Sequence, residues 1–237
     1  MKYSKQGDKS YKLTVNPHIK NPVCPLCKIP GSNVFFSDRH RDYFQCRTCC
    51  LIFVPPDQFL SADDEKAEYD LHENIPGDPA YRRFLNRLFT PIQERIQANS
   101  RGLDFGSGPG PTLSLMFEES GYLMEIYDKF YAKNSQALEK QYDFITATEV
   151  VEHLHNPEKT LARLWGCLKT SGWFGIMTKL AIGKKAFAQW HYKNDLTHVC
   201  FFSRRTFAWL AGRWQADLVL LDKDVILFNK PKITDIL

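Results

Sequence analysis

Leu103-Asp104-Phe105-Gly106-Ser107-Gly108-Pro109-Gly110 is the stretch that decides the fold of this 237-residue chain. A short apolar run ends in an acid, three glycines follow at alternate positions, and a helix-like segment begins after Pro111. Glycine lets the backbone turn sharply and lets a ligand approach its N–H groups closely. A helix start adds unpaired amides and the positive end of the helix dipole. Ligands bind at such places in open α/β sheets, so the stretch predicts a strand, a ligand-binding loop and a helix. A plain glycine-rich turn is the alternative.

The spacing of the glycines argues against a dinucleotide. A dinucleotide fingerprint reads G-x-G-x-x-G, with the ribose-binding acid about 20 residues further on. Here the third glycine comes one residue early, at Gly110, and Pro111 fills the position where that fingerprint has glycine. A second acid, Asp128, closes the next strand-like run, residues 122–127.

Asp104, the glycine loop and Asp128 together resemble the class I S-adenosylmethionine-dependent methyltransferases. The resemblance implies an α/β, Rossmann-like sheet with an antiparallel last strand, and S-adenosylmethionine as the cofactor. It implies that Asp104 and the loop lie under the methionine part of the cofactor. It also implies that Asp128 accepts hydrogen bonds from both ribose hydroxyls, and a carboxylate suits this task because it has two acceptor oxygens and no donor. The implied binding residues of the loop are Gly106, Ser107, Gly108 and Gly110.

The resemblance continues toward the C-terminus. Residues 142–154 resemble the fourth strand of the family and the loop after it, where Glu149 is implied to border the cofactor and the substrate. A helix is expected from Asn156-Pro157, a fifth strand over residues 173–177, and two last strands over 216–221 and 225–228. Little of the segment between the second and fourth strands reads as a strand, so we expect the third strand to be short or missing.

Four cysteines form a second specific motif. Cys24-Pro-Leu-Cys27 and Cys46-Arg-Thr-Cys49 are two C-x-x-C pairs with eighteen residues between them, which is typical of a structural zinc site. The segment between the pairs reads as strands of a zinc ribbon. Disulfides are the alternative, but no signal peptide is apparent and the seven cysteines are odd in number, which favours a reducing, cytoplasmic compartment. Cys50 lies next to a ligand and could compete with Cys49.

These motifs divide the chain into four parts. We expect a basic N-terminal arm over residues 1–20, the zinc ribbon over 21–56, a helical linker or lid over 57–98, and the cofactor-binding domain over 99–237. The net charge of +4 does not by itself indicate nucleic acid. The basic arm could touch RNA phosphates, although a solvated terminus is the simpler interpretation. No apolar run is long enough to span a membrane.

The linker and the loops after the strands supply the candidates for catalysis. Tyr69 and His72 lie on one face of a predicted helix, where they either line the cofactor or substrate site or are ordinary surface residues. Methyl transfer depends on holding donor and acceptor in a reactive geometry, and an acceptor that carries a proton also needs a base. Histidine suits that role near neutral pH. The first candidates for the base are His153 and His198, with His72 and His191 behind them and the Glu149 carboxylate as an alternative.

Three functions agree with this sequence. The preferred one is an S-adenosylmethionine-dependent methyltransferase that acts on an undefined, small-molecule acceptor. The second is an RNA methyltransferase that uses the ribbon and the basic arm to bind RNA, but the ribbon is not strongly basic. The third is a non-catalytic protein that has kept the fold.

Overall fold

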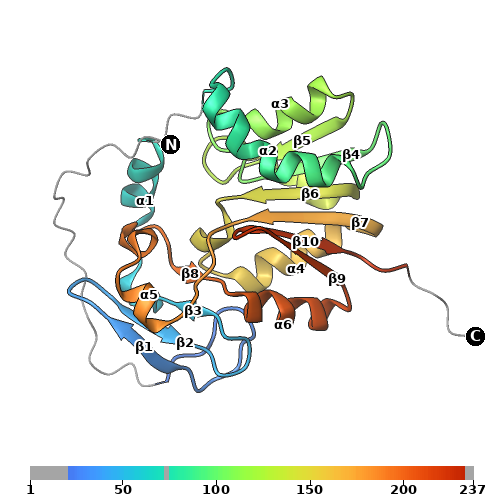
Figure 1. The fold of residues 1–237 in the computed structure, drawn as a ribbon. Coiled ribbons are helices and arrows are strands. Elements are labelled where there is room, and N and C mark those ends of the chain that lie inside the picture. The colour runs from blue at the N-terminus through green and yellow to red at the C-terminus, as the bar shows by residue number, and fades with distance from the viewer. Residues whose placement is uncertain (1–20, 72–74, 233–237) are drawn as a thin grey trace, which may run out of the picture.

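The computed structural model describes residues 21–71 and 75–232. Its larger sheet has six strands (Figure 1). Their order across the sheet is β5 (Leu123–Tyr127), β4 (Arg101–Phe105), β6 (Tyr142–Thr148), β7 (Leu168–Met177), β10 (Val225–Asn229) and β9 (Asp217–Leu221). The first four are parallel, and β10 runs antiparallel to both of its neighbours. The expected Rossmann-like sheet with an antiparallel last strand is therefore confirmed.

The third strand, which we expected to be short or missing, is missing, so β5 forms the edge of the large sheet. The segment that follows β5 instead holds an isolated bridge between Asp128 and Ala132 and a short 3-10 helix, Ser135–Glu139. That helix is anchored through its apolar residues, since Ala137 is buried and its carbonyl accepts a hydrogen bond of 2.7 Å from the Tyr142 hydroxyl.

Helices cover both faces of the large sheet (Figure 1). α2 (Pro79–Gln93) and α3 (Thr112–Glu119) pack on one face, and α4 (Pro157–Cys167) and α6 (Arg204–Trp214) pack on the other. The apolar residues of α2 recur at helical spacing and pack directly on the sheet. A Cβ at Gly175 of β7 would lie only 2.8 Å from Cδ1 of Leu88, so this strand needs a glycine beneath the helix. α2 is thus a layer of the large domain, which differs from the expected division that assigned residues 57–98 to a linker or lid.

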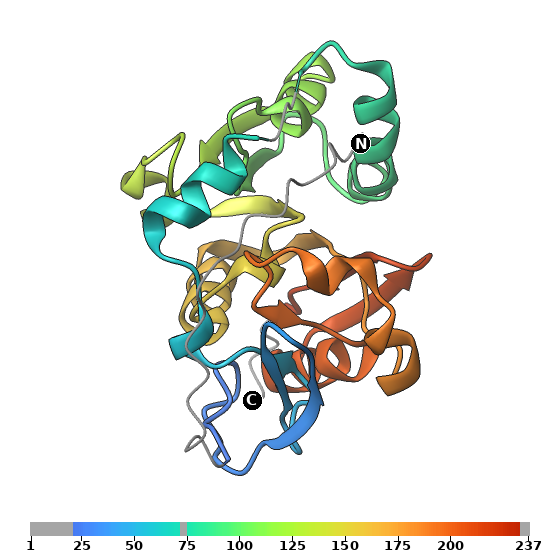
Figure 2. The same ribbon diagram turned by 90° about the vertical axis from the view of Figure 1, so that its left-hand side faces the viewer.

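A second, small sheet combines three strands from the N-terminal part of the chain with one strand from its C-terminal half. Its order is β1 (Asn33–Ser37), β2 (Asp42–Gln45), β3 (Ile52–Phe53) and β8 (Cys200–Phe201), all antiparallel. The first three strands are the expected ribbon, and the fourth comes from the C-terminal half of the chain. Figures 1 and 2 show the small sheet packed beside the large domain, next to α5 (Lys184–Ala188).

Two predicted boundaries shift in the structure. The helix expected over the linker is α1 (Ala62–Tyr69), and its N-cap Ser61 accepts a hydrogen bond from the Asp64 N–H. This helix ends before His72. The fifth strand begins directly after α4, at Leu168, rather than at Trp173. Among the helices of the described residues, none is both long and apolar enough to cross a membrane.

Candidate functional site

A cavity lies at the carboxyl ends of β4, β5 and β6, where ligands bind in folds of this type. Most of the predicted site residues line it: Tyr69, Asp104, Gly106, Ser107, Gly108, Asp128, Glu149, His153 and His198. Gly110 is not part of the lining, because it sits at the start of α3, where its carbonyl accepts a hydrogen bond of 2.7 Å from the Thr112 N–H. His191 is exposed outside the cavity, and His72 falls outside the described residues.

The loop after β4 has a shape that its glycines make possible. Gly106 and Gly108 both have positive φ, +78° and +65°, in the left-handed region that favours glycine. Space is the second constraint at Gly106, because a Cβ there would lie 2.3 Å from Cγ2 of Val150. The Gly106 N–H donates to the Tyr127 carbonyl at 2.7 Å, which ties the loop to the end of β5. The loop is therefore pressed between two strand ends.

Buried polar groups gather beneath and beside this loop. The carboxylate of Asp104 is 4% exposed and accepts one hydrogen bond, from Thr146 Oγ1 at 2.8 Å. Burial, and then the nearby charge of Asp128, raises the pKa of Asp104 to about 6. The hydroxyls of Ser107 and Thr148 also line the cavity and are buried without a hydrogen-bond partner among the described residues. Buried polar atoms normally have partners, so these two hydroxyls indicate that a polar ligand completes the site.

Asp128 connects the glycine loop to the turn after β5. Its Oδ2 accepts a hydrogen bond from the Gly108 N–H at 3.0 Å. Its Oδ1 accepts from the N–H groups of Phe130 and Tyr131, at 2.8 and 3.0 Å. A carboxylate has about four lone-pair positions, so Asp128 has acceptor capacity left for a ligand while it fixes the loop.

Helix α1 covers one side of the cavity with Tyr69. Two pairs tie the helix to the turn after β5: Lys129 Nζ lies 2.6 Å from Oε1 of the buried Glu65, and the Tyr131 hydroxyl donates to Asp70 Oδ1 at 2.6 Å. The ring of Tyr69 lies 5.4 Å from that of Phe130 and 5.1 Å from that of His153, measured between centroids. An ion pair and a hydrogen bond therefore hold α1 against the turn after β5.

Two histidines of the cavity lining meet beside Tyr69. His153 comes from the loop after β6, and His198 comes from the segment before β8. Their ring centroids lie 4.6 Å apart. His153 Nδ1 lies 3.3 Å from the carbonyl of Thr197, and His198 Nδ1 lies 2.7 Å from that of Tyr192. A carbonyl oxygen can only accept, so each Nδ1 carries the proton and each Nε2 is left with a lone pair in the neutral ring.

Acidic groups surround this histidine pair. Glu149 begins the loop after β6 with a left-handed φ of +52°, a conformation that non-glycine residues adopt rarely and often at functional sites. Burial, followed by the charge of Glu152, raises the pKa of Glu149 well above its usual range. Burial, followed by His198, lowers the pKa of His153 well below its usual range. Both shifts favour the uncharged form of the group, and an uncharged imidazole can accept a proton.

The ribbon holds the histidine-bearing segment in place. Arg41, just before β2, is 1% exposed, and its guanidinium donates to four carbonyls of residues 193–198. The acceptors are Lys193 (2.6 Å), Asp195 (3.1 Å), Leu196 (3.0 Å) and His198 (2.9 Å). The Val54 N–H also donates to the Val199 carbonyl at 2.9 Å, which continues the pairing of β3 with β8.

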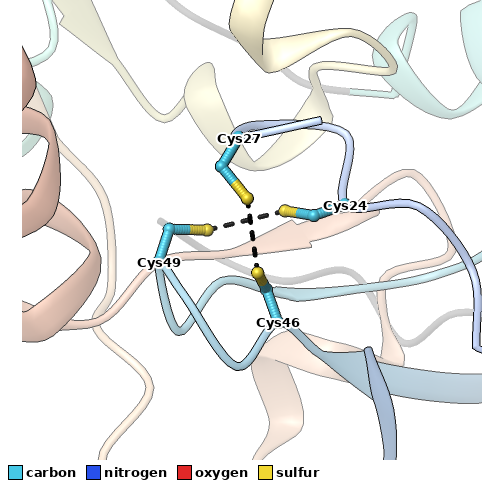
Figure 3. Close-up of side chains that lie close together, drawn as sticks. All are labelled: Cys24, Cys27, Cys46 and Cys49. Carbon is cyan, nitrogen blue, oxygen red and sulfur yellow. Dashed lines mark hydrogen bonds between the residues drawn. The ribbon is translucent and has the colours of Figure 1, made fainter. Parts of the chain in front are cut away.

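The four predicted metal ligands converge in the ribbon. Figure 3 shows their sulfurs pointing at one another, with 3.5 Å between Cys24 and Cys49 and 3.4 Å between Cys27 and Cys46. A disulfide needs about 2.05 Å. Four sulfurs placed about 2.3 Å from a central Zn²⁺ would be separated by about 3.8 Å, which is close to these distances. The buried, all-sulfur cluster therefore fits a tetrahedral zinc ion better than two crosslinks.

The two C-x-x-C turns have the same backbone geometry, and this excludes Cys50 as a ligand. The Cys24 N–H donates to Ile29 O and the Lys28 N–H to Cys24 O, and the second turn repeats both bonds from Cys46. Lys28 and Cys50 occupy the same position of their turns, each with φ of +60°. Cys50 thus follows the turn as Lys28 does, and its sulfur is not part of the cluster.

Comparison with known proteins agrees with the fold. A family model described as a methyltransferase domain matches residues 72–222, so the chain belongs to this methyltransferase family. The solved 1,6-didemethyltoxoflavin-N1-methyltransferase of Burkholderia thailandensis, with 1,6-didemethyltoxoflavin and S-adenosylhomocysteine bound, is 14% identical. That match has a TM-score of 0.49 and covers 83% of this chain and 98% of the other.

A second solved methyltransferase is also similar to this chain. A SAM-dependent methyltransferase from Archaeoglobus fulgidus is 18% identical, with a TM-score of 0.47 and coverage of 63% of this chain and 94% of the other. No curated protein matches the chain.

Several residues of the site were not predicted from the sequence. Thr146 is an ordinary strand residue until its hydroxyl is seen to bond Asp104. Tyr192 and Asp195 lie within the polar and aromatic run before His198, but nothing in that run singles them out. Arg41 contacts residues more than 150 positions away, so no local pattern could reveal its partners.

Proposed function

We propose that this chain transfers the methyl group of S-adenosylmethionine to a small-molecule acceptor bound next to His153 and His198. The observation that carries the proposal is the continuity of the cavity. One lining includes the glycine loop with Asp104 and Asp128 at one end and the two histidines at the other. A methyl donor at the first end and an acceptor at the second would therefore share one cavity.

The residues at the first end fit the cofactor. The family resemblance assigns the ribose hydroxyls to Asp128, whose carboxylate still has acceptor capacity. The resemblance also assigns the methionine part to Asp104 and the loop, where the Ser107 hydroxyl has no partner among the described residues and could bond a polar ligand. The cationic methionine part would also offset the cost of ionising the buried Asp104. When bound, the cofactor supplies an activated methyl group on a sulfonium.

The protein's own contribution is to position the acceptor and remove its proton. Tyr69 and the rings of Phe130 and His153 beside it line the cavity, and a shaped site of this kind favours the reactive geometry on which methyl transfer depends. The Nε2 atoms of His153 and His198 have free lone pairs that could accept the proton of an acceptor hydroxyl or amine. Glu149 is the carboxylate alternative at the same end.

We also propose that the four-cysteine cluster holds a structural Zn²⁺. Four thiolates fill the tetrahedral coordination that zinc prefers, so no position is left for a substrate. The ion would fix both C-x-x-C turns and, through them, strands β2 and β3. Since Arg41 directly precedes β2 and β3 pairs with β8, the metal would support the acceptor end of the cavity from outside. Thiolates of this kind suit the reducing, cytoplasmic location expected from the sequence.

The test of the proposed function has two parts. Calorimetry with S-adenosylmethionine and S-adenosylhomocysteine measures cofactor binding, and a wild-type protein that binds neither would leave only the non-catalytic alternative. A cell extract incubated with the enzyme and radiolabelled cofactor is then fractionated into RNA, protein and small metabolites. Label in small metabolites supports the proposal. Label in RNA, together with salt-dependent RNA retention, would favour the RNA methyltransferase instead.

A further inference from the structure

Two groups of metal-ligating side chains stand out among residues 21–71 and 75–232, and the second one lies in the active cavity. Besides the four cysteines, Glu152, His153 and His198 bring one ligand atom each to within 4.8 Å of the others. Glu152 and His153 come from the loop after β6, whereas His198 comes from the segment that Arg41 holds. The three groups therefore meet through the fold and not through a local sequence motif.

The hydrogen bonds of the two histidines leave the right atoms available for a metal. Both Nδ1 atoms are taken by backbone carbonyls, His153 by Thr197 at 3.3 Å and His198 by Tyr192 at 2.7 Å. This arrangement fixes the tautomer with the lone pair on Nε2. Histidines that bind metals almost always donate their other ring N–H to a carbonyl, a carboxylate or water, which orients the ring and raises its basicity.

The carboxylate of the group is held in the same manner. Glu152 is fully buried, and none of the ion pairs between described residues involves it. Its Oε2 accepts from the Thr178 hydroxyl at 2.9 Å, and its Oε1 accepts from the Tyr192 hydroxyl. Each oxygen keeps a second lone pair. A buried carboxylate is normally paired with a cation or bound to a metal, and two hydroxyl donors compensate its charge only in part.

A fourth group faces the same place. Oδ2 of Asp195 lies 3.6 Å from Nε2 of His198. The other oxygen, Oδ1, is occupied by the N–H of Thr197 at 2.9 Å and its hydroxyl at 2.6 Å. Asp195 and both histidines line the cavity, so an ion in this position would be in contact with a bound acceptor.

We propose that Glu152, His153 and His198 form a binding site for a divalent transition metal at the acceptor end of the cavity. Imidazole and carboxylate ligands suit Zn²⁺, Fe²⁺, Mn²⁺ and Co²⁺, and a set of two histidines and one carboxylate leaves coordination positions open. Asp195 can fill one of these positions. The remaining ones face the cavity, where an oxygen of the acceptor can bind.

The existence of this site does not depend on methyl transfer, but its role does rest on the proposed function. A divalent ion lowers the pKa of a hydroxyl that binds to it. The acceptor oxygen would then form its bond to the methyl carbon as the bond from that carbon to the sulfonium sulfur breaks. The hydroxyl proton leaves to solvent, and S-adenosylhomocysteine is the second product. The site thus favours an acceptor with a hydroxyl group, and the histidines would act as ligands rather than as bases.

The experiment uses the full chain with zinc already bound to the cysteines. CoCl₂ is titrated into the protein, and calorimetry gives the affinity and the number of ions bound. Visible absorption is recorded in parallel, because thiolate-to-cobalt bands would reveal displacement of zinc from the cysteines. We expect wild type to bind one additional ion without thiolate bands. Binding of no additional Co²⁺, or binding only with thiolate bands, would overturn the proposal.

Variants then assign the ion to the site. His198→Asn and Glu152→Gln should each weaken the additional binding by at least about 10-fold. His191→Gln is the matched control, since His191 lies on the same segment but is exposed outside the cavity, and it should bind Co²⁺ as wild type does. Glu152→Gln keeps the size of the buried side chain, and circular dichroism checks that both variants fold. Wild-type affinity in either folded variant would refute the site.

Calorimetry with S-adenosylmethionine separates this proposal from the proposed function. A protein that binds the cofactor but no additional Co²⁺ loses only the metal site. A protein that binds Co²⁺ in this way but not the cofactor keeps the site and loses the proposed function.

Discussion

Replacement of Arg41 by methionine tests whether the ribbon builds the acceptor end of the cavity. The substitution keeps much of the side chain's length and removes the guanidinium that donates to four carbonyls of residues 193–198. The bonds to Lys193 and His198 are buried. The Lys193 carbonyl would keep a bond from the Tyr43 hydroxyl at 3.3 Å, whereas the His198 carbonyl would lose its partner away from water. A buried polar group left without a partner costs about 1–3 kcal/mol, so the substitution predicts a loss of roughly 1–3 kcal/mol. This is a measurable share of the ~5–15 kcal/mol by which a folded domain is usually stable.

The assay combines denaturant unfolding with hydrogen exchange of residues 193–201. We expect Arg41→Met to lower the free energy of unfolding by the stated amount and to speed exchange in this segment more than in the glycine loop. Arg41→Lys should recover little, because a single ammonium cannot reproduce the fork of a guanidinium. Arg39→Met is the matched control, since Arg39 is exposed and, within residues 21–71 and 75–232, its side chain donates to the neighbouring His40 at 2.8 Å. Unchanged exchange of residues 193–201 in Arg41→Met would refute the reasoning.

Four further perturbations address the cofactor end and the metal. Asp128→Ala should abolish binding of S-adenosylmethionine in calorimetry while the protein stays folded, and unchanged affinity would remove its assigned role. Gly106→Ala should destabilise the protein by more than about 1 kcal/mol in a denaturant titration, because its Cβ would meet Val150 at 2.3 Å in a left-handed conformation. Chelation of the zinc proposed at the cysteines should make the ribbon unfold at a lower temperature than the large domain. A melting curve that does not change with the chelator would count against zinc. The raised pKa of Asp104, about 6 against a usual 3.8, means that the folded apo-protein holds this proton more tightly than the unfolded chain does. Its unfolding free energy should therefore fall by up to about 3 kcal/mol as pH rises from about 4 to above 6. Asp104→Asn should remove that loss, so a variant no more stable than wild type at pH 7.5 would contradict the assignment.

Those parts of the site that depend on neighbouring residues could be predicted from the sequence. The loop from Asp104 to Gly110 encodes its own turn, since the φ values of Gly106 and Gly108 are ones that glycine adopts freely. The missing third strand could be predicted because the polar segment between Asp128 and Asp143 is too short for a strand and a helix. The two C-x-x-C turns were also local, because each closes on itself through hydrogen bonds within six residues.

The remaining features depend on which distant segments meet. β8 has only two residues, Cys200 and Phe201, and so short a strand has no periodicity to detect. The helical spacing of the apolar residues in α2 indicates a buried face. Such a pattern does not reveal which part of the protein that face packs against. Its partner is the sheet around Gly175, far along the chain. His153 and His198 were each predicted as candidate bases, but their meeting, and the position of Glu152 beside them, were not predicted.

The two ends of the cavity are built by different means. The cofactor end consists of loops that follow β4 and β5, and the side-chain hydrogen bonds of Asp104 and Asp128 stay within residues 104–146. The acceptor end depends on the segment that carries Asp195 and His198. Hydrogen bonds from Arg41 and the pairing of β3 with β8 hold this segment in place. Damage to the ribbon should therefore weaken acceptor binding and turnover while the affinity for S-adenosylmethionine changes little. Since His198 is also a ligand of the proposed second metal, loss of the cysteine-bound zinc should weaken Co²⁺ binding in the cavity as well. Equal loss of cofactor affinity would instead mean that the ribbon supports the whole fold.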